Sequence, residues 1–474
     1  MKLSRRDFLK VSALTGAGAA LAACAQPAPA PQPAQPAAKA EPTKPPAQAA
    51  PVSITYLVRT DIQPTLIKWG EATVEEFQKL NPNIKVEMVG VPWGDYNAKL
   101  LAMYAAGTPP EVSANYAAGF ATFYANKAIL PLDEYVKSEK VDLTVLEKAA
   151  LDSVTRDGKL WAFPLAHQPV VVFYNRDLFE KNGVKPPPAD WADKTWTNGV
   201  YADSAAKIAK NLDDPKKAEW GGEYWEGQLG TLLFWGYVVD GFNNKGGPDK
   251  TEAYKTGKLT EVYLDQPKCV EAMQWFMDLT YKLKAAPRPS DTDALNQAVG
   301  WSFLSGRIAM AIQGTWRLGD IMKTKPAYKW GMAALPYGPA GLSTCPLFND
   351  SWMLGAKAKN PDAGFKFLRY VALENGAKLY AESTGFFPAK KDLYNIFFDS
   401  IMKAENFANS RDELVKVMTG GFATGLASPG KTLDRFPELN TAWTQTTAPM
   451  RNGEATVPDG MKAVQAKFKS LISA

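Results

Sequence analysis

The stretch from Asp157 to Phe179, DGKLWAFPLAHQPVVVFYNRDLF, places the strongest constraint on how this chain can fold. It reads as a β-strand that leads through a proline-marked crossing into a second strand, PVVVFYN, whose apolar residues continue without alternation. Such strands are typical of sheets that helices cover on both faces, so the stretch favours an α/β fold. The polar pair His167 and Gln168 lies between the two apolar segments, and it is either a local structural device or part of a binding cleft.

Strand and helix patterns alternate in the chain before this stretch. Strands are predicted at 53–59, 84–91 and 112–116, and amphipathic helices at 66–80 and 96–104 follow the first two. This alternation predicts a mostly parallel sheet whose ligand face lies at the carboxyl ends of the strands.

The first residues indicate export. Arg5 and Arg6, followed by Phe-Leu-Lys, match the twin-arginine pattern, which carries proteins across the membrane already folded. The apolar segment 11–23 is too short to span a bilayer as a helix. It ends in Leu-Ala-Ala-Cys, which looks like the lipobox of bacterial lipoproteins, so residues 1–23 are the expected signal peptide and Cys24 the expected lipidated residue. The alternative is an uncut signal followed by an ordinary buried cysteine.

Residues 24–51 are expected to form a tether. They consist almost entirely of Ala, Pro and Gln, and this composition offers too few apolar side chains to build a core. In extended polyproline geometry such a segment could hold a folded body up to roughly 80 Å from the lipid. The globular body is therefore predicted to begin near Val52.

Composition excludes several classes of function. Removing the first 23 of the 474 residues leaves 451, enough for two lobes, and lowers the formal charge from +5 to +2, which gives no reason to expect a nucleic-acid partner. A single histidine and the absence of a Cys-x-x-Cys pair argue against a zinc site, and no other metal or cofactor is expected. Cys269 and Cys345 could form one disulfide outside the cytoplasm, although the sequence cannot establish the pairing.

Several stretches together resemble the extracellular solute-binding proteins of bacterial ABC importers, family 1, which includes maltose-binding and other sugar-binding proteins. They are FQKLNPNIKVEMVGVPWGDYNAKL with AAGTPPEV, the stretch 157–179, FLSGRIAMAIQGTWRLGDI with WGMAALPYGP, and KNPDAGFKFLRYVALENGAKLYAESTGFFPAKKDL. Their order and spacing, rather than any single motif, carry the resemblance. They cover most of 52–394.

The resemblance implies a two-lobe, hinge-connected α/β fold of the type II periplasmic-binding-protein kind, with the solute held between the lobes. Lobe 1 would hold 52–167 and about 350–400, and lobe 2 would hold 168–349 and about 401–474. The hinge would lie near 166–169. The protein would be an exported, lipid-anchored monomer that delivers a carbohydrate to the permease subunits of an ABC importer.

Aromatic and polar residues near predicted strand ends are the candidates for sugar binding. A pyranose has an apolar face that suits a flat ring, and a rim of hydroxyls that suits fixed amides and carboxylates. The resemblance implies that Trp316, in the turn Gly-Thr-Trp, stacks on the sugar. The full set of expected ligand-binding residues is Asp61, Asn115, Tyr116, Gln168, Trp235, Asp240, Trp316, Asp350 and Trp352.

Two of these positions carry alternatives. Asp61 could instead cap the helix that follows it. Gln168 stands where maltose-binding members usually have a carboxylate, and this departure puts maltose itself in doubt.

Two other functions remain open at this stage. A peptide or glycerol phosphate could replace the sugar, and a phosphate would call for cations such as Arg59, Arg317 and Arg435. An enzyme would need a carboxylate pair, for which Glu223 and Glu226 are the candidates, although solvated surface glutamates are far commoner.

Overall fold

The computed structural model describes residues 51–60, 64–115, 119–224, 256–339, 341–422, 425–427 and 433–473. All described residues lie in one compact unit, 50–474. Within them, no helix combines the length and the apolar character that crossing a membrane requires.

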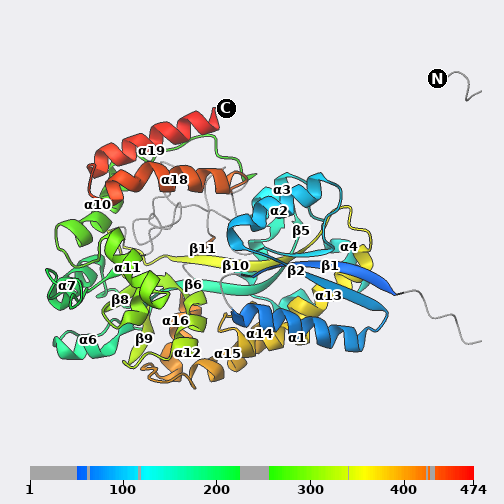
Figure 1. The fold of residues 1–474 in the computed structure, drawn as a ribbon, viewed down its shortest axis with the longest axis horizontal. Helices are drawn as coiled ribbons and strands as arrows, with labels where there is room; N and C mark the ends of the chain where they lie inside the picture. Colours follow the sequence, from blue (N-terminus) through cyan, green and yellow to red (C-terminus); the bar gives the residue numbers. More distant parts are fainter. Residues whose placement is uncertain are drawn as a thin grey trace, which may run out of the picture. The chain divides into compact units, whose positions relative to one another are not determined.

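Alternating strands and helices build the amino-terminal part of the body, as the sequence predicts. The order is β1 (Val52–Arg59), α1 (Pro64–Leu80), β2 (Ile84–Val91), α2 (Trp93–Ala105) and β3 (Val112–Asn115). β1 pairs in parallel with both β2 and β3, so their carboxyl ends meet at one edge. These elements lie on one side of the body in Figure 1.

Two long strands connect the two parts of the body. The first, β6 (Phe163–Asn175), is a single continuous strand of 13 residues, all buried, so the predicted break between two strands at His167 and Gln168 is wrong. A short separate strand, β5 (Lys159–Leu160), precedes it. The second is β10 (Cys345–Leu354), which runs antiparallel to β6 over Phe163 to Pro169 and antiparallel to β3. Figure 1 shows both strands passing through the middle of the body.

Beyond Pro169, β6 exchanges β10 for new partners. Residues 170–174 pair antiparallel with β8 (Met310–Gly314), and residues 172–175 pair antiparallel with β9 (Trp330–Ala333). The strand order is β2-β1-β3-β10-β6-β8-β7, and β7 is the short strand Glu223–Tyr224, parallel to β8. β11 (Gly425–Ala427) pairs in parallel with β10. The sheet is therefore mixed.

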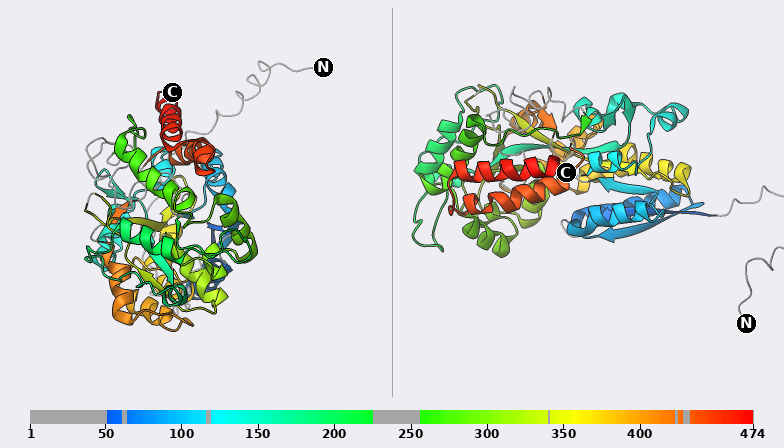
Figure 2. Two further views of the ribbon diagram at one scale, coloured as in Figure 1. Left: turned by 90° about the vertical axis from the view of Figure 1, so that its left-hand side faces the viewer. Right: turned by 90° about the horizontal axis from the view of Figure 1, so that it is seen from above.

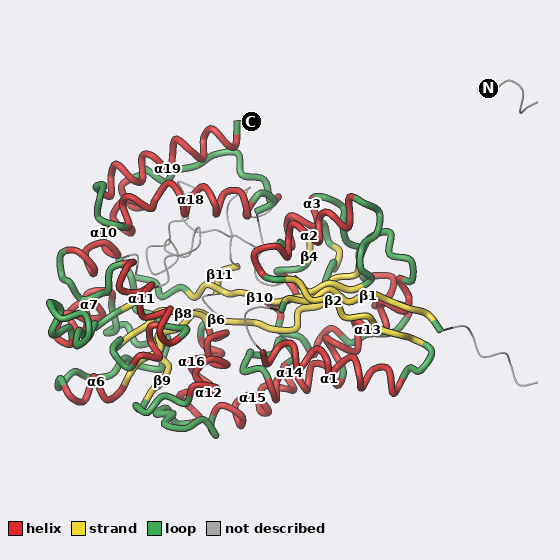
Figure 3. Tube along the Cα trace, viewed as in Figure 1, coloured by secondary structure: helices red, strands yellow, loops and turns green. Residues whose placement is uncertain are grey.

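Helices surround these strands, as Figure 3 shows by secondary structure. The two helices at the carboxyl end of the chain, α18 (Phe436–Arg451) and α19 (Val457–Ile472), lie side by side in both views of Figure 2. The remaining described elements are α3 (Phe120–Ala125), α4 (Asp133–Ser138), η2 (Leu143–Val145), α5 (Lys148–Asp152), β4 (Thr155–Arg156), α6 (Arg176–Lys181), α7 (Asn198–Ile208), α10 (Pro267–Tyr281), α11 (Pro289–Val299), η4 (Ser302–Ser305), η5 (Thr315–Arg317), α12 (Leu318–Thr324), α13 (Pro361–Leu373), α14 (Asn375–Ser383), η6 (Lys391–Leu393), α15 (Tyr394–Ile401) and α16 (Arg411–Gly420).

Side-chain packing divides the body into two large hydrophobic cores. One core draws its buried residues from 54–166 and 352–393, and the other from 170–348 and 387–468. Both cores include residues of β6, because this strand enters one core with Phe163 and the other with Val170. Two cores on one chain make the fold two-lobed. We call them core 1 and core 2; the lobe boundaries given above remain a prediction.

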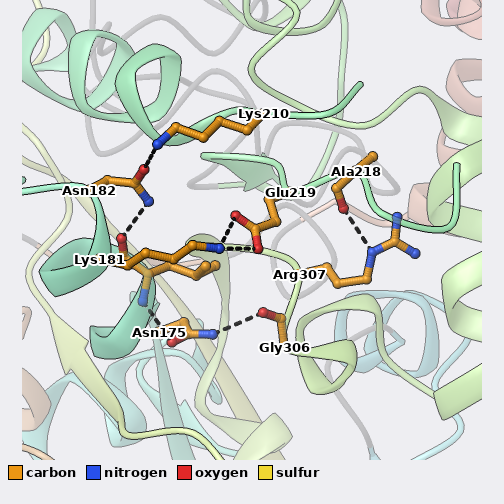
Figure 4. A network of polar contacts seen from close by, with 9 residues as sticks. Asn175, Lys181, Asn182, Lys210, Ala218, Glu219, Gly306 and Arg307 are labelled. Carbon is orange, nitrogen blue, oxygen red and sulfur yellow. Dashed lines mark hydrogen bonds and ion pairs between the residues drawn. The ribbon is translucent and has the colours of Figure 1, made fainter. Parts of the chain in front are cut away.

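A network of polar contacts links α6, the segment that ends at Glu219 and the residues before β8 (Figure 4). Lys181 Nζ lies 2.7 Å from Glu219 Oε1, and Arg307 Nε donates to the Ala218 carbonyl at 2.8 Å. The guanidinium of Arg307 also lies over the Trp220 ring, 5.0 Å from its centre. These contacts tie both α6 and Arg307, which precedes β8, to the segment 218–220. We therefore assign this charged cluster a structural role.

Candidate functional site

The candidate site lies where the two cores meet, at the carboxyl end of β8. Trp316, in the turn η5, is half-buried and packs against both core 1 and core 2. Its ring meets Phe348 of β10 edge to face, with centroids 5.1 Å apart and an interplanar angle of 82°. A tryptophan that is held in this way and stays partly exposed presents a fixed apolar surface beside the connecting strands.

Gln168 brings a polar group to the same place. Its Oε1 accepts a hydrogen bond from Thr315 Oγ1 at 2.8 Å and one from the Phe387 backbone N–H at 3.4 Å. Because both bonds are accepted by Oε1, they fix the orientation of the amide, and the NH₂ group points away from Thr315 Oγ1 and the Phe387 N–H. The side chain is 1% exposed, and its Nε2 is buried without a hydrogen-bond partner in the described part of the chain. An unsatisfied buried donor costs free energy and therefore calls for an acceptor.

Buried polar residues follow one another in β10 beside Gln168. In the pairing of β10 with β6, Phe348 lies opposite Gln168 and Asp350 opposite Ala166. On the other side, Ser351 lies opposite Asn115 at the end of β3, and Asn115 Nδ2 donates to Ser351 Oγ at 3.2 Å. The strand pairing thus gathers three of the predicted site residues, Asn115, Gln168 and Asp350, around one central strand.

His167, next to Gln168, has a different role. Its Nδ1 bonds to Asn349 Oδ1, and the Nδ2 of that asparagine donates to Ser153 Oγ at 2.6 Å, so the imidazole carries its proton on Nδ1. Burial lowers the pKa of His167 to about 4, and its ring packs against Phe422. His167 is therefore a neutral structural residue that fastens β6 to β10.

The remaining predicted residues are placed as follows. Trp352 is fully buried in core 1, where its Nε1 donates to Tyr56 Oη at 2.8 Å and its ring meets Trp69 edge to face. This packing leaves it no surface for a sugar, and we leave it out of the proposed site. The other four predictions, Asp61, Tyr116, Trp235 and Asp240, lie outside the described residues, as does Glu226.

The structure also places residues that could have indicated an enzyme, a phosphate site, a metal site or a disulfide. Glu223 is held by Ser302, whose Oγ lies 2.5 and 2.6 Å from its two carboxylate oxygens. Arg317 pairs with Asp320 and Arg435 with Glu438, while Arg59 ends β1. Within the described ranges, no cluster of His, Cys, Asp and Glu could hold a metal ion. Cys269 and Cys345 are both buried thiols, so they do not form the disulfide that the sequence allowed.

Sequence reasoning did not select Thr315 and Ser351, although both contact predicted site residues. Thr315 adjoins Trp316 and could have been found from that neighbour. Ser351 could not, because its contact with Asn115 spans 236 residues and depends on the pairing of β10 with β3.

The two lobes also touch away from the connecting strands. Thr122 Oγ1 of α3, beside core 1, donates to the backbone carbonyl of Asp434 at 2.8 Å, just before α18. Burial raises the pKa of the Asp434 carboxyl, while the positive charges of Arg156 and Lys258 act to lower it. This contact spans the two parts of the body that β6 and β10 join.

Comparison with known proteins gives two family matches. The family model described as "Bacterial extracellular solute-binding protein" matches residues 61–378, about two thirds of the chain. The model for the signal sequence of the twin-arginine translocation pathway matches residues 2–22.

Among curated sequences, a protein of Brucella abortus (strain 2308) that is named only as a binding protein is 26% identical over 333 residues, which cover 68% of this chain and 72% of that protein. The sn-glycerol-3-phosphate-binding periplasmic protein UgpB of Escherichia coli (strain K12) is 25% identical over 342 residues, covering 69% and 72%. The ABC substrate-binding protein Lmo0181 of Listeria monocytogenes, solved in complex with cycloalternan, aligns with a TM-score of 0.73 at 22% identity, over 89% of this chain and 99% of that chain. The structural likeness shows the shared two-lobe fold.

Proposed function

Because the chain belongs to the bacterial extracellular solute-binding proteins, and is the exported solute-binding component of an ABC importer rather than an enzyme, we propose that its solute is a carbohydrate. A mono- or oligosaccharide would bind between the lobes, at the junction of core 1 and core 2, and be passed to the membrane permease. The lobes would be divided as predicted from the sequence, with the hinge at 166–169.

The juxtaposition of Trp316 and Gln168 carries this proposal. Trp316 presents a partly exposed ring, and Thr315, the residue before it, fixes the amide of Gln168 so that its buried Nε2 lacks an acceptor. A pyranose suits both groups, since its apolar face can stack on the ring and its hydroxyl oxygens can accept from the amide. Asn115 and Asp350 would complete the polar rim. The four residues Asp61, Tyr116, Trp235 and Asp240 remain proposals from the sequence.

Glycerol phosphate is the second candidate, because a curated relative at 25% identity is named for binding it. A phosphate ligand needs convergent cations. Of the three arginines that the sequence offered, Arg317 and Arg435 are ion-paired to carboxylates three residues away, at 2.9 and 2.8 Å. Carboxylates already neutralise these guanidinium groups, so the geometry favours the uncharged solute.

We also propose that the protein acts as a monomer on a lipid anchor. Cys24 would carry the lipid after removal of residues 1–23, and the Pro- and Ala-rich segment up to residue 51 would be the tether. A Cys24→Ser variant should then leave the membrane fraction for the soluble exported fraction.

A thermal-shift panel tests the choice of solute. The panel would contain monosaccharides, di- and trisaccharides of the gluco, manno and galacto series, and sn-glycerol 3-phosphate. A solute that binds only the folded protein raises Tm in proportion to the logarithm of its concentration over its Kd. We expect a shift from at least one sugar series and none from glycerol phosphate. The reverse pattern would reject the carbohydrate in favour of the second candidate.

A further inference from the structure

A cavity of about 270 Å³ lies inside lobe 2, between β7, β8, α10 and α11. Its walls include Glu223, Asn296, Trp301, Gln313 and Arg317. Pockets that enclose a whole drug-sized ligand measure about 300 to 1,000 Å³, so this cavity suits one ring-sized unit rather than a complete oligosaccharide.

Two side-chain amides in the cavity wall are fixed as donors. Asn296 Oδ1 accepts from the Ser302 backbone N–H at 2.8 Å, and Gln313 Oε1 accepts from the Gly314 backbone N–H at 3.0 Å. Because both oxygens are used in this way, the amide orientations are determined and the NH₂ groups remain for other acceptors. Gln313 is only 7% exposed, so its donor serves the cavity rather than bulk water.

Charged groups complete the wall without giving it an excess of positive charge. Glu223 is fixed by Ser302, yet a carboxylate has about four acceptor sites, so it can also bind a hydroxyl of a ligand. Arg317 lies over the ring of Trp301 at 5.5 Å, and its buried Nε makes no hydrogen bond to any described residue. With Arg451 and Asp293, the lining holds two positive and two negative side chains, and Arg317 is also paired with Asp320, which lies outside the lining. Fixed donors and acceptors without an excess of positive charge suit a neutral, polyhydroxylated unit.

One short segment of the chain supplies residues both to the cavity wall and to the candidate site. The segment 313–317 places Gln313 and Arg317 in the cavity wall, while its middle residues serve the junction: Thr315 bonds to Gln168 and Trp316 packs between the two cores. A single turn at the end of β8 therefore borders both places.

We propose that this cavity is a second sugar subsite, which holds one further ring of a ligand whose first ring lies against Trp316. The solute is then an oligosaccharide of at least two units, with Glu223 as an acceptor and Asn296, Gln313 and Arg317 as donors to the second ring. This inference rests on the carbohydrate function proposed above.

Calorimetric titration of the full mature chain tests the subsite. The probes are glucose, maltose and maltotriose, and mannose, mannobiose and mannotriose. In the series that binds, the disaccharide should bind about tenfold or more tightly than its monosaccharide, since each ring would gain hydrogen bonds to charged and fixed polar groups.

Two variants and one matched control test whether this gain in affinity comes from the cavity. Thr292 is a half-buried residue of α11 that lines the cavity, so Thr292→Trp would fill the cavity and reduce the affinity for the disaccharide to that for the monosaccharide. Ser290→Trp, exposed on the same helix and outside the cavity, is the matched control and should keep the full gain. Glu223→Gln keeps the shape of the side chain and should lose about tenfold of the gain through the weaker acceptor.

The outcomes separate the subsite from the proposed function. Equal affinities for mono- and disaccharide, or a gain that survives both Thr292→Trp and Glu223→Gln in folded variants, would overturn the subsite while leaving a sugar-binding protein. Failure of every sugar in both series, and of the galacto series of the thermal-shift panel, to bind the unmodified protein would overturn the carbohydrate function and the subsite with it.

Discussion

Lowering the pH from 7 to 5 should destabilise the protein through His167, the only histidine of the chain. The imidazole is fully buried where β6 meets β10, and its Nε2 has no hydrogen-bond partner within the described ranges. A second proton would have to enter at this nitrogen. Burial accordingly lowers the pKa of His167 to about 4, from its ordinary 6.5.

The sign and the size of the effect follow from these two pKa values. Between pH 6.5 and pH 4 the unfolded chain binds a proton that the folded protein does not, so the free energy of unfolding falls as the pH falls. The complete effect is about 3 kcal/mol, and about 2 kcal/mol of it is lost by pH 5, where most carboxylates are still ionised. Above pH 7 the contribution of His167 is constant.

Nuclear magnetic resonance measures the pKa directly, because one histidine gives one set of imidazole signals. We expect these signals to stay constant from pH 7.5 to pH 5. Chemical denaturation at pH 7, 6 and 5 should show the loss of unfolding free energy, and His167→Asn should flatten this dependence while keeping a side-chain donor toward Asn349. An imidazole that titrates near pH 6.5 in the folded protein would refute the reasoning.

Three further predictions concern packing and the contact between the lobes. Gly221→Ala should lower the free energy of unfolding by at least about 1 to 3 kcal/mol, because a Cβ would lie 1.9 Å from the Ala205 carbonyl oxygen. Gly199→Ala, in the open first turn of α7, should instead raise the free energy of unfolding by up to about 1 kcal/mol. Equal changes for the two variants in denaturation curves would contradict the close approach of Gly221 to Ala205. Burial raises the pKa of the Cys345 thiol, so a thiol reagent should label this residue only after unfolding, and labelling of the native protein would show that it is accessible. Thr122→Val removes a hydrogen bond between the lobes and should weaken solute binding about fivefold, chiefly through faster dissociation, whereas unchanged dissociation kinetics would show that the bound state does not depend on this contact.

The order of strands and helices could be predicted from the sequence, but the continuity of β6 could not. Prolines at 164 and 169 suggested a break, since proline interrupts the hydrogen bonds of a central strand. In the structure Pro169 lies where β6 passes from β10 to β8 and β9, so the missing N–H falls at the exchange of partners. The buried apolar run on either side holds the strand together.

The candidate site was predicted in part for similar reasons. Thr315 and Trp316 are neighbours in sequence, so their shared turn could be expected, and the placement of Gln168 beside them follows from β6 as the connecting strand. The partners in β10 depend on pairings between segments that lie far apart in the sequence, which no local pattern encodes. Trp352 was predicted wrongly for the opposite reason. A tryptophan near a strand end can equally belong to the hydrophobic core, and here its indole N–H donates to the hydroxyl of the buried Tyr56.

Calorimetric titration with sugars of the mature protein and of two matched tryptophan variants tests the central claim most directly. Trp316 and Trp275 are both half-buried, but only Trp316 lies between the two cores, while Trp275 packs against Tyr201 and Phe276. We expect Trp316→Ala to lower sugar affinity at least about a hundredfold, as the loss of a central aromatic anchor does, and Trp275→Ala to keep it. Full sugar affinity in a folded Trp316→Ala variant would show that the sugar does not stack on Trp316.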